Sequence, residues 1–266
     1  MKEKFVNWFK AEYVNDYKLF DYLFLLALVV MQVVCFVIYP DSPISIIATI
    51  AGTICTVLCA KGKISFYVLA YIQTILFCII DWQMHFYIDL AEQAFYLLTM
   101  VYGIYTWKRN LQKTDEGSLE VHAKKLTWWQ NIIMAVIVIA GTILVGYIGQ
   151  RIGSHQPYTD AFSNVCAIFA QILLVACYRE QWILWIILDI ADIKMYFAGG
   201  NPVVGVMYIG WTLNCIYGWY NWTKSTKKAP SSQDDYKLPL FERDRCTFRE
   251  FFENWEKLLT EDNEDQ

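Results

Sequence analysis

One apolar segment of the chain, residues 182–198, carries a row of residues that could bind a small molecule. Five of them are spaced three, four, three and four residues apart, which places them on one face of a helix: Trp182, Trp185, Asp189, Asp192 and Tyr196. A carboxylate inside a membrane helix is costly unless it faces a polar cavity or a partner. The row therefore predicts a polar passage, although Asp192 could instead pair with Lys194 and the tryptophans could be ordinary interface residues.

Two further apolar segments place polar side chains at a similar depth. They add four residues to the predicted substrate-binding set: Gln93, Tyr96, Asn214 and Tyr217. Aromatic faces beside a carboxylate favour a flat cation, and amides suit the hydroxyl groups of a sugar. The amides could also simply bond one helix to another. With the tryptophans and carboxylates above, these residues predict a site for a flat, cationic ring that bears hydroxyl groups.

The composition of the 266-residue chain is that of a membrane protein. Hydrophobic residues make up 56% of it and charged residues only 18%, whereas soluble domains usually carry about a quarter charged residues. A transmembrane helix needs about 20 apolar residues, and eight segments qualify. We expect an all-α integral membrane protein with eight transmembrane helices, near residues 18–39, 44–60, 64–81, 86–107, 129–150, 161–178, 182–198 and 202–223.

The distribution of Lys and Arg predicts how these helices are oriented. If the N-terminus is cytoplasmic, the cytoplasmic segments before the C-terminal tail hold fifteen of them and the opposite side holds two, Arg151 and Lys194. Cytoplasmic loops carry the excess of positive charge in membrane proteins. We therefore expect a multi-pass membrane protein with both termini cytoplasmic.

Patterns that mark other classes of protein are missing from the sequence. The eight cysteines form no CxxC or Cys/His metal spacing, and the three histidines do not cluster. Walker A, G-x-S-x-G and H-E-x-x-H patterns do not occur. We therefore expect no catalytic residue, metal, cofactor or nucleic-acid partner. Carboxylates inside a membrane can relay protons, so a proton-coupled carrier stays an alternative.

An internal repeat predicts how the helices are arranged. The sequence Y-G-x-Y-x-W occurs at residues 102–107 and again at 217–222, each time followed by basic residues. We expect one three-helix repeat at about residues 43–107 and a second at 158–223, with a linker helix at 128–152 between them. One intervening helix makes the two repeats parallel, as in one recognised class of transporters. The first span is then a leader helix.

Both ends of the chain lie outside this transmembrane domain of residues 17–224. Residues 1–16 place Phe5, Trp8, Phe9 and Tyr13 on one face, which indicates a helix lying at the membrane surface. Residues 225–266 form an acidic cytoplasmic tail with an amphipathic helical pattern: Phe248, Phe251, Phe252, Trp255, Leu258 and Leu259. The tail helix could pack against the membrane domain or a sister subunit, or bind a regulatory partner.

The row in the seventh span resembles a known signature. Residues 180–185, Glu-Gln-Trp-Ile-Leu-Trp, together with Asp189 are similar to the E-x-W-x-x-W-x-x-x-D/N pattern of the PnuC family of bacterial vitamin transporters. Residues 93–96, Gln-Ala-Phe-Tyr, followed by the first Y-G-x-Y-x-W, are similar to the pattern in the first half of that family. The resemblance runs from about residue 44 to 224.

The resemblance implies a fold, a function and a location in the bacterial inner (cytoplasmic) membrane. The fold would be a 3+1+3 arrangement like a full-length version of the SWEET sugar transporters, assembled as homotrimers. The function would be facilitated diffusion of nicotinamide riboside, made directional by phosphorylation inside the cell. The family motif matches this sequence most directly at Gln93, Trp182, Trp185 and Asp189. Thiamine and riboflavin are alternative substrates, and the long acidic tail is not part of the family pattern.

Overall fold

The chain divides into two units, Met1–Lys228 and Ala229–Gln266. The computed structural model describes residues 6, 9–10, 12–40, 42–85, 87–113, 118–151, 153, 157–200 and 202–227. The second unit, with the amphipathic pattern predicted at residues 248–259, lies outside the described residues. So do residues 1–5, 7, 8 and 11, which make up much of the predicted surface helix.

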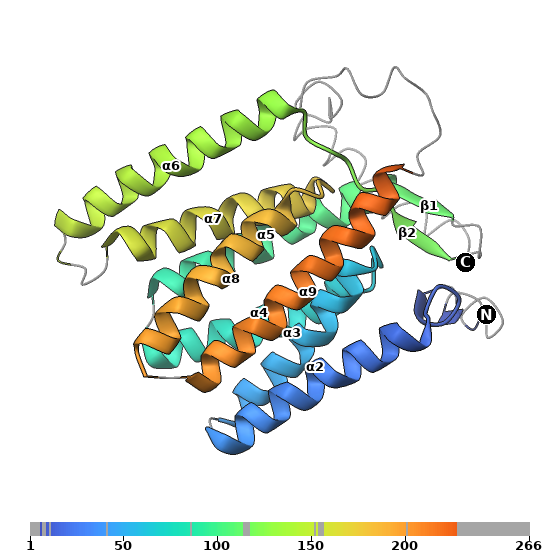
Figure 1. The fold of residues 1–266 in the computed structure, drawn as a ribbon, viewed down its shortest axis with the longest axis horizontal. Helices are drawn as coiled ribbons and strands as arrows, with labels where there is room; N and C mark the ends of the chain where they lie inside the picture. Colours follow the sequence, from blue (N-terminus) through green and yellow to red (C-terminus); the bar gives the residue numbers. More distant parts are fainter. Residues whose placement is uncertain are drawn as a thin grey trace, which may run out of the picture. The chain divides into compact units, whose positions relative to one another are not determined.

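The described residues form eight long helices, which confirms that the eight predicted segments are helical (Figure 1). Their bounds differ from the predicted ones by at most four residues. The helices are α2 (Leu19–Ile38), α3 (Pro43–Ala60), α4 (Phe66–Met84), α5 (Tyr87–Arg109), α6 (Trp128–Arg151), α7 (Pro157–Val175), α8 (Gln181–Ala198) and α9 (Pro202–Lys227).

The largest differences from the predicted bounds have simple causes. Pro157 begins α7 four residues before the predicted start, and Pro43 and Pro202 also begin helices. A first helical residue needs no backbone N–H, and proline has its φ already set for the helix. At the other end, α7 stops at Val175 because Cys177 adopts a positive φ of 64°.

Five of the eight helices are long and apolar enough to cross a membrane: α2, α3, α4, α6 and α7. The other three have similar lengths but carry more polar residues. α8 contains three charged side chains, Asp189, Asp192 and Lys194. Two of these side chains, Asp189 and Asp192, belong to the row of residues that predicts the binding site.

A short hairpin between α5 and α6 was not predicted. Strand β1 (Leu111–Lys113) pairs antiparallel with β2 (Leu119–Val121). Strands of three residues are too short to show an alternating pattern in the sequence. The hairpin is joined to the turn after α3, because the Val121 N–H donates to the Gly62 carbonyl at 2.9 Å.

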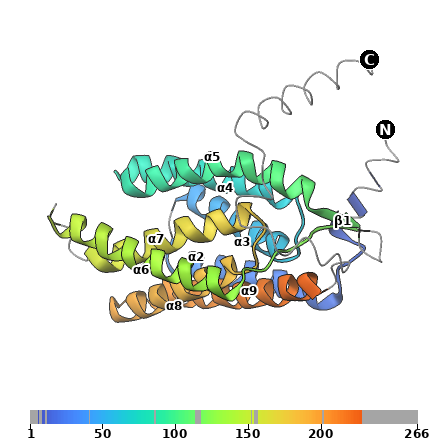
Figure 2. The same ribbon diagram turned by 90° about the horizontal axis from the view of Figure 1, so that it is seen from above.

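Helices α3 and α7 are the most buried of the five apolar helices, and α6 is the least buried. α3 contacts α2, α4 and α9, whereas α7 contacts α5, α6 and α8. α6 lies along α7, away from α2 and α3 (Figures 1 and 2). The core is therefore built around one central helix from each predicted repeat.

Candidate functional site

Trp182 lies at the centre of the main core cluster. Its side chain is only 3% exposed and meets Trp222 edge to face, with ring centroids 5.9 Å apart. Gly218 of α9 packs directly against this indole, because a Cβ there would lie 2.6 Å from its ring atoms. The contact brings the beginning of α8 against the end of α9.

Trp185 and Tyr96 border the same cluster. Both are half-buried, and Trp185 also packs against a second cluster formed by α6, α7 and α8 around Cys166 and Leu188. The Tyr96 hydroxyl donates to the carboxylate of Glu92. Gln93 is half-buried on α5, three residues before Tyr96. Trp182, Trp185 and Tyr96 are thus brought together by one cluster.

Asp189 and Asn214 are buried on two helices that pack against each other, α8 and α9. They are 4% and 1% exposed. The thiol of Cys215, the residue after Asn214, lies 3.5 Å from Asp189 Oδ2 and donates to it. No sequence pattern indicates this role for Cys215, because a cysteine in an apolar run looks like a packing residue.

Several buried polar atoms of the described residues have no hydrogen-bond partner within the described protein. They include the indole nitrogen of Trp182 and the Asn214 side-chain oxygen, together with both amide atoms of Gln32 on α2. A buried polar group without a partner costs about 1–3 kcal/mol. A polar ligand or water molecules would satisfy such atoms.

Neither carboxylate of the α8 row is in an ion pair. In the described part of the chain, no Lys or Arg nitrogen lies within 4.0 Å of Asp189 or Asp192, and Lys194 is exposed. The ion pairs found there involve other acids: Lys61–Asp21, Lys63–Asp16, Lys63–Glu120 and Arg179–Glu180. The alternative that Asp192 pairs with Lys194 is therefore not realised.

The hydroxyl of Tyr217 binds a residue outside the predicted substrate-binding set. Its hydroxyl donates to Asp21 Oδ1 at 2.6 Å, and its ring lies 5.1 Å from that of Phe24. Both partners belong to α2. Tyr217 thus borders the main cluster while its polar atom binds the leader helix.

Gln171 of α7 is a buried polar residue that the sequence reasoning missed. It is 4% exposed, and its amide donates to the Thr99 hydroxyl of α5 at 3.1 Å. A single Gln in an apolar helix, outside any row, carries no signal of its own. The described residues contain no group of three or more His, Cys, Asp or Glu that could hold a metal ion.

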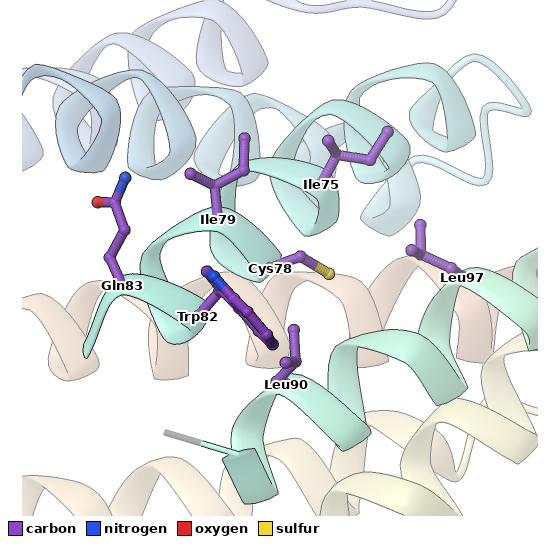
Figure 3. A pocket seen from close by; sticks show the side chains of 7 residues that line it. All are labelled: Ile75, Cys78, Ile79, Trp82, Gln83, Leu90 and Leu97. Carbon is purple, nitrogen blue, oxygen red and sulfur yellow. The ribbon is translucent and has the colours of Figure 1, made fainter. Parts of the chain in front are cut away.

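An open groove of about 480 Å³ lies on the outside of α4 and α5 (Figure 3). Six of its seven lining residues are apolar or weakly polar, and it is lined by Ile75, Cys78, Ile79, Trp82, Gln83, Leu90 and Leu97. None of the predicted site residues lines it. It is therefore separate from the candidate site at α8 and α9.

Comparison with known proteins gives consistent matches. Residues 42–224 match the family model described as nicotinamide mononucleotide transporter. The nicotinamide riboside transporter PnuC of Haemophilus influenzae is 35% identical, over 83% of this chain and 96% of that protein. The crystal structure of the vitamin B3 transporter PnuC superposes with a TM-score of 0.72 at 29% identity, covering 84% of this chain and 98% of that one. The riboflavin/roseoflavin transporter RibM of Streptomyces davaonensis is 25% identical, over 50% of this chain and 62% of that protein.

Proposed function

We propose that this chain, which belongs to the PnuC family of nicotinamide riboside transporters, carries nicotinamide riboside across the membrane by facilitated diffusion. Family membership makes it a multi-pass membrane transporter and not an enzyme. The observation that best supports this substrate is the buried carboxylate of Asp189 among aromatic side chains. This carboxylate forms no ion pair with a Lys or Arg of the described residues.

Nicotinamide riboside matches this lining in two respects. Its pyridinium ring is flat and positively charged, which suits the faces of Trp182 and Trp185 and the negative charge of Asp189. Its ribose hydroxyls would pair with Asn214 and Gln93, whose amides can both donate and accept. In this proposal Tyr96, Asp192 and Tyr217 complete the substrate-binding set, with Tyr217 contributing its ring because its hydroxyl binds Asp21.

The same charges disfavour the mononucleotide that appears in the description of the family model. A phosphate group carries negative charge and is usually held by Arg, Lys or backbone N–H groups. Asp189 and Asp192 would repel it, and no Lys or Arg of the described residues contacts either carboxylate. The neutral ribose of the riboside avoids this repulsion.

A parallel 3+1+3 repeat is part of the proposal, and several paired positions support it. The helices of the two halves, α3 and α7, α4 and α8, and α5 and α9, begin 114 or 115 residues apart. The Trp107 indole donates to the Leu174 carbonyl at 2.9 Å, and the Trp222 indole donates to the Cys59 carbonyl at 3.0 Å. The two tryptophans are 115 residues apart in the sequence, and so are their acceptors, Cys59 and Leu174.

The repeat provides a physical basis for alternating access. Trp107 ends the last helix of one half and binds the first helix of the other half, and Trp222 does the reverse. Gly103 and Gly218 repeat the same relationship, because they pack against Tyr67 and Trp182, which also lie 115 residues apart. Two equivalent halves that hold each other this way could rock about a shared site, as parallel-repeat transporters do.

Orientation, assembly and direction of transport complete the proposal. The excess of Lys and Arg supports cytoplasmic termini, so substrate would leave the carrier on the side where a kinase can phosphorylate it. Facilitated diffusion gives no accumulation by itself, and phosphorylation would trap the riboside inside the cell. The family resemblance supports a homotrimer.

The test of substrate is uptake of labelled compounds into proteoliposomes that contain the purified protein. We expect nicotinamide riboside to enter faster than thiamine or riboflavin, and uptake to persist when the pH gradient is collapsed. Riboflavin is the main rival, since RibM is related to this chain. Preferred uptake of riboflavin would refute the proposed substrate, and uptake abolished by collapse of the pH gradient would instead indicate proton coupling.

A further inference from the structure

Acidic residues gather at one end of the helix bundle, beyond Trp185 and Asp189 of the predicted substrate site. α4 and α5 are joined by a short turn, so Asp81 near the end of α4 and Asp89 at the start of α5 lie at the same end. A second short turn joins α8 to α9. Near it lie Asp192 and Tyr196, in the last turns of α8, and Tyr208, in the second turn of α9.

The two pairs of helices turn at the same end of the bundle. Trp107 near the end of α5 binds Leu174 near the end of α7, so the beginnings of α5 and α7 lie at one end. α8 runs back from the end of α7 and finishes at that same end. It is the end opposite the Lys-rich turns, and the proposed orientation makes it the outer end.

The side chains at this end are close enough for their charges to interact. Asp89 interacts in this way with Asp81 and Asp160, and Tyr196 interacts with both Asp192 and Asp89. Asp89 of α5 therefore lies near Tyr196 of α8. The cations at this end are Lys194, which is exposed, and Arg151, which donates to the Tyr147 hydroxyl at 2.6 Å.

Asp81 points to a ligand independently of the charge cluster. It is only 7% exposed, and its Oδ2 atom has no hydrogen-bond partner within the described protein. A buried carboxylate is normally paired or bound to a cation. An incoming cation would supply the missing partner and relieve the repulsion between Asp81 and Asp89.

Three aromatic rings of α8 and α9 gather at the same end. Tyr196 and Tyr208 stack with ring centroids 5.3 Å apart and an angle of 21° between the planes. Trp211 meets Tyr208 edge to face at 5.0 Å. Aromatic faces beside carboxylates are a favourable environment for an organic cation.

We propose that Asp81, Asp89, Tyr196 and Tyr208 form an outer cation station, a second binding site where a flat organic cation is held before it passes Asp192 and reaches Trp185 and Asp189. Asp189, the nearer of these two residues, is seven residues before Tyr196 on α8, about 10 Å along the helix. The station is therefore distinct from the deeper site. The inference rests on the proposed function for the identity of the cation, which would be the pyridinium of nicotinamide riboside.

The first test measures influx of nicotinamide riboside into proteoliposomes at low ionic strength. We expect Asp81→Asn with Asp89→Asn to raise the KM for influx roughly three- to tenfold while the maximal rate stays near the parental value. Tyr196→Leu should raise KM similarly. Raising the salt concentration should raise the parental KM and leave that of the double variant nearly unchanged.

Two control variants separate the station from general effects at this end of the protein. Lys194→Gln removes a cation from the same end and should lower KM or leave it unchanged. Trp82→Leu removes a ring that is 65% exposed beside the groove of Figure 3 and should have no effect. An influx KM of the double carboxylate variant equal to the parental value would overturn the proposal.

A second readout does not depend on transport. In a Cys78→Ser, Cys246→Ser background, Tyr196→Cys can be modified by cationic or anionic methanethiosulfonate reagents, and the ratio of the two rates reports the local potential. We expect the cationic reagent to react faster, and Asp81→Asn with Asp89→Asn to reduce the ratio several-fold. An unchanged ratio overturns the station. If the parental protein transports no nicotinamide riboside, the proposed function fails, while the ratio still decides whether the station attracts cations.

Discussion

The hydroxyl of Tyr217 donates a 2.6 Å hydrogen bond to Asp21 and so ties α9 to the leader helix α2. Asp21 also accepts from Lys61 at 3.1 Å, at the turn that follows α3. One carboxylate therefore connects three segments that are far apart in the sequence. This network stabilises α2 against both α3 and α9, the two helices that it contacts.

Tyr217→Phe keeps the ring and removes this hydrogen bond. Hydrogen bonds to charged groups contribute roughly 1.5–3 kcal/mol, so we expect a lower melting temperature in detergent and a KM for uptake within about twofold of the parental value. Tyr220→Phe is the matched control, because Tyr220 is on the same helix and 65% exposed. A large rise in KM with no change in melting temperature would show instead that the hydroxyl contacts substrate.

Trp185→Ala should weaken substrate binding without unfolding the protein, because Trp185 is only half-buried. Loss of a stacked aromatic face that holds a cation costs about 0.5–2 kcal/mol, which corresponds to a KM roughly 2- to 30-fold higher. Uptake assays with Trp185→Ala and Gln93→Ala, each checked for folding by size-exclusion chromatography, would measure this. Parental rates in both variants would show that the site is misplaced.

Asp189→Asn tests whether charge selects the substrate. The variant keeps the size of the side chain and removes the negative charge, so uptake of the cationic riboside should fall about tenfold or more. Cys215→Ala is the control, because it removes the thiol that donates to Asp189 and leaves the carboxylate in place. Equal loss in both variants would indicate a structural role for this contact and no selection by charge.

Gly218→Ala and Gly103→Ala test the equivalence of the two halves. A methyl group at residue 218 would lie 2.6 Å from the Trp182 ring, and one at residue 103 would collide with the Tyr67 hydroxyl. Overpacking of this kind costs about 1–3 kcal/mol, so both variants should melt at lower temperatures. Gly141→Ala, where the nearest contact is 3.2 Å, should have a smaller effect. Sensitivity at only one of the two equivalent glycines would argue against the paired arrangement.

The helices could be predicted from the sequence because a bilayer sets the length of an apolar span. Even α8 was found despite Asp189, Asp192 and Lys194, since its other residues are apolar and aromatic. The hairpin of β1 and β2 could not be predicted, because it depends on a backbone hydrogen bond between Val121 and Gly62, 59 residues apart in the sequence. Short elements held by such distant contacts leave no local pattern.

The candidate site was predictable only in part. Trp182, Trp185 and Asp189 share one helix, so their common face follows from spacing alone. The donor to Asp189 is Cys215 and the partner of Tyr217 is Asp21, and both contacts join different helices. Such contacts depend on how helices pack against one another, which periodicity within a single helix does not specify.

Counterflow in proteoliposomes tests the central claim, that this chain is a facilitative carrier of nicotinamide riboside, most directly. Vesicles loaded with unlabelled nicotinamide riboside are diluted into a trace of the labelled compound, with no pH or ion gradient across the membrane. We predict that vesicles with the parental protein accumulate the label transiently, and that vesicles with the Trp185→Ala variant accumulate less. Accumulation with riboflavin and not with nicotinamide riboside, or with neither unless a proton gradient is applied, would contradict the account.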